Sequence, residues 1–184
     1  MPLHSEKVRL FVAAYPPPQT VVALVGLLEL VALPPHQVAS DMHLTVHFIG
    51  PVERRELPRI RETLERAASG LAAFEVTPIR LIGLPERSPR LVAVELDLPY
   101  ELAELQRRLA HRFSHKNSGR AYVPHVTLAR WRPGGIEKIG PVPVEAGTFA
   151  VREICLMSSV LKPSGAEHHL LGRVVLRSGT ERTG

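Results

Sequence analysis

Short apolar runs rich in valine, isoleucine and leucine alternate along this chain with longer segments whose apolar residues recur at helical spacing. The runs predict strands and the longer segments predict amphipathic helices, because side chains repeat every two residues in a strand and every 3.6 in a helix. The predicted strands are 8–14, 74–81, 91–96, 148–156 and 169–176, and the predicted helices are 20–32, 53–68 and 101–113. Helices mixed with neighbouring strands indicate an α+β protein with antiparallel-rich sheets.

One four-residue pattern occurs twice, each time inside an apolar, strand-like run. The two copies are His43-Leu44-Thr45-Val46 and His125-Val126-Thr127-Leu128. A strand sends successive side chains to opposite faces, so in each copy the histidine and the threonine share one face and the two apolar residues share the other. Each motif strand is therefore expected to present a polar pair to a cleft and an apolar pair to a core.

The segments around the two motifs also resemble each other. Strand 8–14 and helix 20–32 precede the first motif, and strand 91–96 and helix 101–113 precede the second at similar spacing. This order predicts an internal duplication with two pseudo-symmetric lobes, each an antiparallel-rich sheet with helices, flanking a central cleft that carries both motifs. We expect one bilobal domain over residues 1–177 and a flexible tail over 178–184.

Two histidines and two hydroxyls in one cleft are suited to acid–base chemistry on a phosphodiester. Histidine has an ordinary pKa near 6.5, so it serves as base or acid at neutral pH. On opposite sides of one phosphorus atom, one ring takes a proton from the attacking group while the other protonates the leaving oxygen. The threonine hydroxyls are placed to hydrogen-bond phosphoryl oxygens or their own histidines. Spacing alone leaves open which histidine plays which role.

At the level of whole motifs the chain resembles the 2H phosphoesterase superfamily, and within it the RNA 2',3'-cyclic phosphodiesterases, also called 2'-5' RNA ligases. The resemblance rests on segments 43–50 and 124–130, on 9–14 followed by Pro16 and Pro17, and on the late segment 156–165. It implies metal-independent hydrolysis of RNA 2',3'-cyclic phosphate ends to 2'-phosphates, with no cofactor. Reversible, ATP-independent 2'-5' RNA ligation is implied as a second activity, which fits the lack of a Gly-rich Lys-Ser/Thr loop.

The resemblance also implies residue roles. His43 is the proton donor and His125 the proton acceptor, with Thr45 and Thr127 beside them. Arg130 matches the arginine just after the second motif and is expected to bind substrate phosphate through its fork of donors. Strict alternation puts Arg130 on the opposite face from His125, so this role requires a bulge or a strand end that redirects it.

Three alternatives stay open at this stage. The substrate could be a small cyclic nucleotide or an ADP-ribose cyclic phosphate in place of RNA. The protein could instead bind RNA ends without catalysis. A zinc site at His43, His47 and His125 is also conceivable, because alternation puts His47 on the face of His43, but we expect no metal. Of the pair His168 and His169, one is expected on the surface and one near the cleft.

Charge and composition are consistent with a polyanionic partner such as RNA. The 184 residues carry a net charge of +5, with an isoelectric point near 9.9. On the predicted helices, Arg59, Arg61, Arg107 and Arg108 are expected to be the solvated face. Aromatic residues make up only 5%, so base stacking is limited to a few candidates. These candidates are Phe48, Tyr122, Trp131 and Phe149.

The remaining features concern compartment and oligomeric state. The single cysteine, Cys155, excludes an intrachain disulfide and is expected to be buried in a strand. The apolar run 21–33 is too short to span a bilayer, and no signal stretch is recognised. We therefore expect a cytoplasmic monomer with no membrane contact. Segment 114–120 is expected to be a mobile basic loop just upstream of the second motif.

Overall fold

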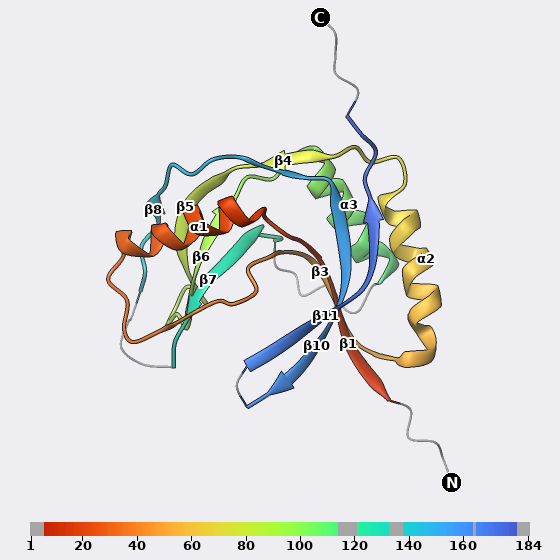
Figure 1. Ribbon diagram of the computed structural model, residues 1–184, viewed down its shortest axis with the longest axis horizontal. Coiled ribbons are helices and arrows are strands. Elements are labelled where there is room, and N and C mark those ends of the chain that lie inside the picture. The colour runs from red at the N-terminus through yellow and green to blue at the C-terminus, as the bar shows by residue number, and fades with distance from the viewer. Residues whose placement is uncertain (1–5, 114–120, 133–137, 164, 180–184) are drawn as a thin grey trace, which may run out of the picture.

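The computed structural model describes residues 6–113, 121–132, 138–163 and 165–179, and it has the expected α+β architecture (Figure 1). The helices are α1 (Pro18–Gly26), α2 (Leu57–Ala68) and α3 (Tyr100–Arg112), with short 3-10 turns η1 (Leu27–Leu30) and η2 (Arg54–Glu56). The strands are β1 (Lys7–Ala14), β2 (Gln37–Val38), β3 (Leu44–Glu53), β4 (Phe74–Val76), β5 (Pro78–Leu84), β6 (Leu91–Leu96), β7 (His125–Arg130), β8 (Val142–Pro143), β9 (Phe149–Val151), β10 (Glu153–Lys162) and β11 (Gly165–Val175). The predicted loop 114–120 and residues 180–184 of the predicted tail lie outside the described residues.

Most strands belong to one antiparallel sheet whose order is β11-β10-β1-β3-β7-β6-β5-β8, with β2 added beside β7. The sequence predicts a separate sheet for each lobe, and this prediction is wrong because the strands of both halves belong to one sheet. The two motif strands, β3 and β7, join the halves through a single registered pair, Leu44 and Val126. Residue alternation predicts which face a strand buries, but it carries no information about which strand lies next to it.

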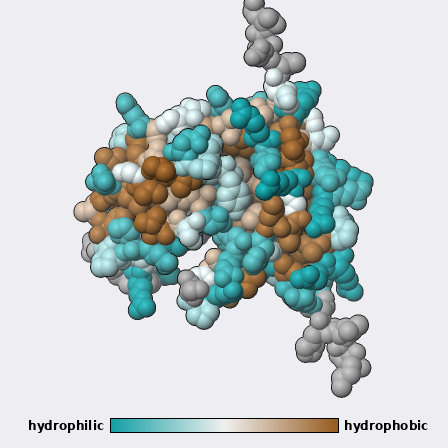
Figure 2. Space-filling model, viewed as in Figure 1, coloured by the Kyte–Doolittle hydropathy of each residue, from teal (hydrophilic) through white to brown (hydrophobic). Residues whose placement is uncertain are grey.

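The two halves of the sheet are built in the same order, as the spacing of the motifs predicts. In the first half β1 leads through α1 to β3, and in the second β6 leads through α3 to β7. Each motif strand pairs antiparallel with the strand that opens its half. Figure 2 shows a hollow in the molecular outline between the side that carries α1 and the side that carries the β10–β11 hairpin.

Two predicted strands are each divided between different sheets. The predicted strand 74–81 becomes β4 and β5, and the predicted strand 148–156 becomes β9 and β10. β4 and β9 pair only with each other, whereas β5 and β10 lie in the large sheet. Between β4 and β5 the Thr77 amide leaves the strand ladder and donates a hydrogen bond to the Asp97 carboxylate at 2.7 Å. A continuous apolar pattern does not reveal such a change of partner.

The helices cover the sheet with the faces that their periodicity predicts. α2 buries Ile60, Leu64, Ala67 and Ala68, and α3 buries Leu102, Leu105 and Leu109. α2 and α3 lie next to each other on one side of the molecule (Figure 1). Glu104 binds both Arg107 and Arg108. Arg107 is 68% exposed, as expected for the solvated face, whereas Arg108 is 26% exposed and donates to the Ala67 and Ser69 carbonyl oxygens at the end of α2, so its predicted place on the solvated face is wrong. None of the helices within the described residues is long and apolar enough to cross a bilayer.

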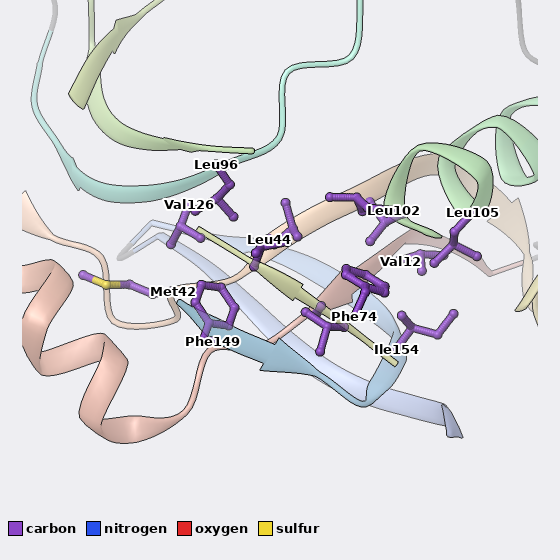
Figure 3. Packing of buried hydrophobic residues seen from close by; sticks show 14 of the residues in the cluster. Val12, Met42, Leu44, Phe74, Leu96, Leu102, Leu105, Val126, Phe149 and Ile154 are labelled. Carbon is purple, nitrogen blue, oxygen red and sulfur yellow. The ribbon is translucent and has the colours of Figure 1, made fainter. Parts of the chain in front are cut away.

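The core receives the apolar residues of both motifs. Leu44, Val46, Val126 and Leu128 are at most 1% exposed, and Figure 3 shows Leu44 and Val126 among the side chains of Leu96, Leu102, Val12 and Ile154. Cys155 is also buried, in β10, as predicted. Because the core holds the apolar face of each motif strand, the histidines and threonines are directed away from it. The cytoplasmic location and the monomeric state stay predictions.

Candidate active site

A cavity of about 740 Å³ brings the residues predicted from the two motifs together. His43 immediately precedes β3, Thr45 lies at the start of β3, and His125 and Thr127 come from β7. Both strands are central in the sheet and meet at Leu44 and Val126, so their polar faces converge on one side of this junction. The residues of the predicted site that line the cavity are His43, Thr45, His125, Thr127 and Arg130.

The two histidines are held in the same way. The Nδ1 atom of His43 lies 2.9 Å from the Asp41 carbonyl oxygen, and that of His125 lies 2.8 Å from the Val123 carbonyl oxygen. A carbonyl oxygen only accepts hydrogen bonds, so Nδ1 is the donor in both rings. This fixes the tautomer and leaves Nε2 as the nitrogen of each ring that is able to take up a proton.

A bulge in β7 explains how Arg130 reaches the cavity. Thr127 pairs with Ala93 and Ala129 pairs with Val92, so Leu128 has no partner in β6. The extra residue shifts the alternation by one position, and Arg130 joins the face of Thr127. Its backbone is paired on both sides, with Leu91 of β6 and Gln37 of β2. The bulge that the expected phosphate-binding role of Arg130 requires is therefore present in β7.

The surroundings of Arg130 leave its charge available to a ligand. Among the ion pairs between described residues, none involves Arg130. Partial burial lowers its pKa, yet a guanidinium stays charged at neutral pH. A partly desolvated arginine without a carboxylate partner is suited to binding an anion.

A second bulge removes His47 from the site. His47 pairs with Val12 and Thr45 pairs with Ala13, so Val46 has no partner in β1. The face then changes, and among the described residues the cavity wall contains Phe48 and not His47. The His47 ring lies instead 6.1 Å from the Phe113 ring. The expectation that His47 shares the face of His43 is wrong, and with it the zinc site formed by His43, His47 and His125.

Asp41 and His168 are residues of the site that the motifs do not reveal. The Asp41 Oδ2 atom accepts a hydrogen bond from the Tyr15 hydroxyl at 3.2 Å and lies 2.5 Å from His168 Nδ1 and 3.5 Å from His43 Nδ1. The contacts with His43 first, and then with His168, lower the pKa of the Asp41 carboxyl to about 2, although partial burial opposes this shift. Burial and the nearby Asp41 carboxylate raise the pKa of Tyr15.

Of the two adjacent histidines, His168 lines the cavity and His169 is 57% exposed. This agrees with the expectation of one cleft residue and one surface residue. The aspartate has a weak sequence signal, since it stands two positions before His43 and therefore on the same side by alternation. His168 has no such signal, because it lies 127 residues away from Asp41.

Only one of the four candidate stacking residues has its ring free in the cavity. Phe48 lines the wall and is 73% exposed. Phe149 is buried in the core, Trp131 is buried beside a neighbouring pocket, and the Tyr122 hydroxyl donates to the Thr45 carbonyl oxygen at 2.9 Å. Tyr122 is therefore hydrogen-bonded to the backbone of the first motif, whereas Phe48 is the residue able to stack on a base.

A comparison of the sequence with known protein families agrees with the geometry of the site. The model of the 2'-5' RNA ligase superfamily matches residues 16–162, which include both motifs. The chain belongs to this superfamily. The resemblance that the two His-x-Thr motifs and their neighbouring segments indicate is thereby confirmed.

One curated relative and two solved structures show how far the similarity to known proteins extends. A Thermotoga maritima protein named RNA 2',3'-cyclic phosphodiesterase is 29% identical over 154 residues, which cover 78% of this chain and 80% of the relative. The crystal structure of TT0787 from Thermus thermophilus superimposes with a TM-score of 0.77 at 24% identity, covering 94% of this chain and all of that one. The apo structure of E. coli LigT gives a TM-score of 0.74 at 26% identity, covering 95% and 100%. The α+β fold with its large antiparallel sheet is therefore that of the 2'-5' RNA ligase superfamily.

Proposed function

We propose that this protein hydrolyses RNA 2',3'-cyclic phosphate ends to 2'-phosphates by acid–base catalysis with His43 and His125, without a metal ion. The observation that carries the proposal is that both His-x-Thr pairs and Arg130 line one cavity. Each imidazole is oriented through Nδ1, so both rings have Nε2 available for proton transfer. The name of the Thermotoga maritima relative supports the same substrate class.

In the proposed reaction a water molecule attacks the phosphorus atom from the side opposite the ribose 3' oxygen. His125 takes the proton from the water as the new P–O bond forms, and His43 gives its Nε2 proton to the 3' oxygen as the old P–O bond breaks. The product has a 2'-phosphate and a 3'-hydroxyl. Exchange of one proton with solvent at each ring restores both histidines. When the attacking group is a 5'-hydroxyl of RNA in place of water, the same displacement joins it to the cyclic phosphate in a 2'-5' linkage and frees the 3'-hydroxyl, and no nucleotide triphosphate is needed.

The surroundings of the two rings support this division of roles. The Asp41 carboxylate lies 3.5 Å from His43 Nδ1, so the ring proposed as proton donor has a negative charge beside it. His125 stands opposite Glu95 in the sheet, but Glu95 is bound by Arg80 at 2.6 Å. The Asp41 carboxylate is shared with His168 and Tyr15, but among the described residues no arginine or lysine pairs with it, which suits a proton donor at His43, whereas the carboxylate opposite His125 is paired with an arginine.

The remaining polar groups of the cavity are suited to holding the phosphate. The hydroxyls of Thr45 and Thr127 and the guanidinium of Arg130 line the same wall as the two rings. Donors that are already in place where negative charge develops lower the barrier, because little reorganisation is needed during the reaction. E. coli LigT has been crystallised with phosphate and with 3'-AMP, and we expect the corresponding groups to occupy this cavity.

The test is hydrolysis of an oligonucleotide that ends in a 2',3'-cyclic phosphate, with a chelator present throughout. We expect conversion to the 2'-phosphate isomer at an unchanged rate after exhaustive chelation. Separation of the 2'- and 3'-phosphate products by chromatography gives the readout. Loss of activity on chelation, or a 3'-phosphate product, would contradict the proposed mechanism. RNA binding without any turnover would favour an RNA-end binding protein.

A small cyclic nucleotide is the second candidate substrate. E. coli LigT has been crystallised with the mononucleotide 3'-AMP, and also with ATP and NADP+, so nucleotide-sized ligands fit a member of the superfamily. A cyclic mononucleotide or an ADP-ribose cyclic phosphate would use the same two histidines. Comparing kcat/KM for a cyclic mononucleotide and for a cyclic-ended oligonucleotide of the same terminal base separates the two candidates.

Arg130→Ala is expected to raise KM for the cyclic-ended oligonucleotide about tenfold. The variant loses a charge-assisted hydrogen bond to the phosphate, and such a bond contributes about 1.5 kcal/mol where solvent reaches the site. Steady-state kinetics give KM and kcat separately. Arg132→Ala is the matched control, because Arg132 lies two residues further on and lines only the neighbouring pocket. Equal effects of the two substitutions would contradict a specific phosphate contact at Arg130.

A further inference from the structure

Three potential metal ligands lie together at one side of the cavity, and the proposed hydrolysis uses only one of them directly. Asp41, His43 and His168 each offer one ligand atom, and the three atoms lie within 4.8 Å of one another. We propose that this group is a binding site for a divalent transition metal such as Zn²⁺, and that metal bound there inhibits the enzyme. The inhibition rests on the function proposed above, whereas the metal binding does not.

The geometry of the three ligand atoms is close to that of a metal site. Oδ2 of Asp41 lies 2.5 Å from Nδ1 of His168 and 3.5 Å from Nδ1 of His43. Tetrahedral bonds of about 2.1 Å place neighbouring ligand atoms about 3.4 Å apart. Small shifts of the side chains are therefore enough to let the three atoms share one ion.

The two rings are held in place by packing that does not depend on a metal. The Phe11 ring, which is buried, lies 5.1 Å from the His43 ring and 4.9 Å from the His168 ring, measured between centroids. The two imidazoles meet edge to face at 5.2 Å. The Tyr15 hydroxyl donates to the same Asp41 oxygen, which is the kind of outer contact that orients a metal-binding carboxylate. Such prior ordering reduces the entropy lost when a metal binds.

The ligand types decide which metals fit. Two imidazole nitrogens and one carboxylate oxygen suit Zn²⁺, Co²⁺ or Ni²⁺, whereas Mg²⁺ and Ca²⁺ prefer oxygen ligands alone. All three residues line the cavity, so a fourth position stays open to water or to a phosphate oxygen. Three protein ligands with one open position are typical of an accessible zinc site.

Binding of a metal at this place competes with the proposed role of His43. In the metal-free protein Nδ1 of His43 donates its proton to the Asp41 carbonyl oxygen. A metal on Nδ1 replaces that proton and breaks the hydrogen bond that orients the ring. His43 is then no longer positioned as the proton donor, so the fraction of active enzyme falls as the site fills.

Calorimetric titration of the metal-free full chain with Zn²⁺ tests the binding, and the absorption spectrum with Co²⁺ tests the coordination. We expect one Zn²⁺ per chain and a Co²⁺ spectrum of tetrahedral type. Binding should weaken at acidic pH, because protons compete for the two imidazoles. Asp41→Asn and His168→Ala should each weaken Zn²⁺ binding at least about tenfold, since even outer contacts of metal sites contribute 10–100-fold. Circular dichroism and a thermal melt establish that the variants are folded.

His169→Ala is the matched control, because His169 is the neighbouring histidine of the same strand and is exposed. It should bind Zn²⁺ as the wild type does. The absence of saturable binding to the wild type would overturn the metal site, and so would binding that persists in both Asp41→Asn and His168→Ala. The inhibition is measured as the ratio of activities with and without Zn²⁺ in each folded protein. This ratio should be low in the wild type and in His169→Ala and should rise toward one in His168→Ala, and activation by Zn²⁺ would overturn the inhibition while leaving the site.

Discussion

His125→Ala and His43→Ala are each expected to lower kcat for a cyclic-ended oligonucleotide by about 10²–10⁴-fold. In the proposed mechanism each variant lacks one of the two groups that exchange protons with the attacking water and with the ribose 3' oxygen. KM should change less, because Arg130 and the two threonines of the cavity wall still hold the phosphate. Single-turnover kinetics measure the chemical step directly, and RNA binding by each variant is measured in parallel.

The double variant shows whether the two histidines act together in one step or contribute to the rate independently. Residues that act as a unit have strongly non-additive effects, so His43→Ala combined with His125→Ala should be little slower than the slower single variant. The control is His111→Ala, which removes an exposed histidine of α3 and should leave kcat unchanged. Undiminished turnover in either single variant would refute the role given to that histidine. Retained RNA binding with lost turnover would distinguish the enzyme from an RNA-end binding protein.

Leu44→Ala is expected to lower the free energy of unfolding by about 2–5 kcal/mol. Leu44 is 0% exposed, and its truncation both loses buried apolar area and leaves a cavity in a close-packed core. The residue also makes the one registered pair between β3 and β7, so the space opens where the two halves of the sheet meet. Against a typical total of about 5–15 kcal/mol, this is a large loss. Urea denaturation followed by circular dichroism gives its size.

Leu30→Ala is the matched control for this substitution. Leu30 is 54% exposed in the turn after α1, and the change of side chain is identical. We expect its effect to stay within about 0.5 kcal/mol, as is usual for surface positions. If Leu44→Ala cost no more than Leu30→Ala, the junction between the two motif strands would not be part of the cooperative core.

The alternation inside each motif was sufficient to predict which way its side chains point. Leu44 and Val126 are in the core, and the histidines and threonines line the cavity. This prediction is reliable because a strand surrounded by others has only two faces, and burying the apolar one fixes the other. The helical segments were predicted for the same reason, since the buried residues of α2 and α3 repeat at intervals of three and four.

The same alternation was misleading where a strand contains an extra residue. The bulge at Val46 turns His47 out of the cavity, and the bulge at Leu128 turns Arg130 into it. A bulge depends on how many residues of the neighbouring strand lie opposite, and that number is a property of the pair of strands. The position of a bulge therefore cannot be read from the alternation of residues in one strand alone.

The sequence by itself determined the three helical segments, most of the strands, the two His-x-Thr motifs, the family resemblance and the face on which each motif residue lies. These features depend on local periodicity and local motifs, which can be read directly from the sequence. Only the tertiary structure decided that one continuous sheet joins the two halves, that Arg130 faces the cavity, and that Asp41 lies beside His168. Such facts depend on which distant segments pack together, and pairing over 127 residues is set by the packing of the whole core.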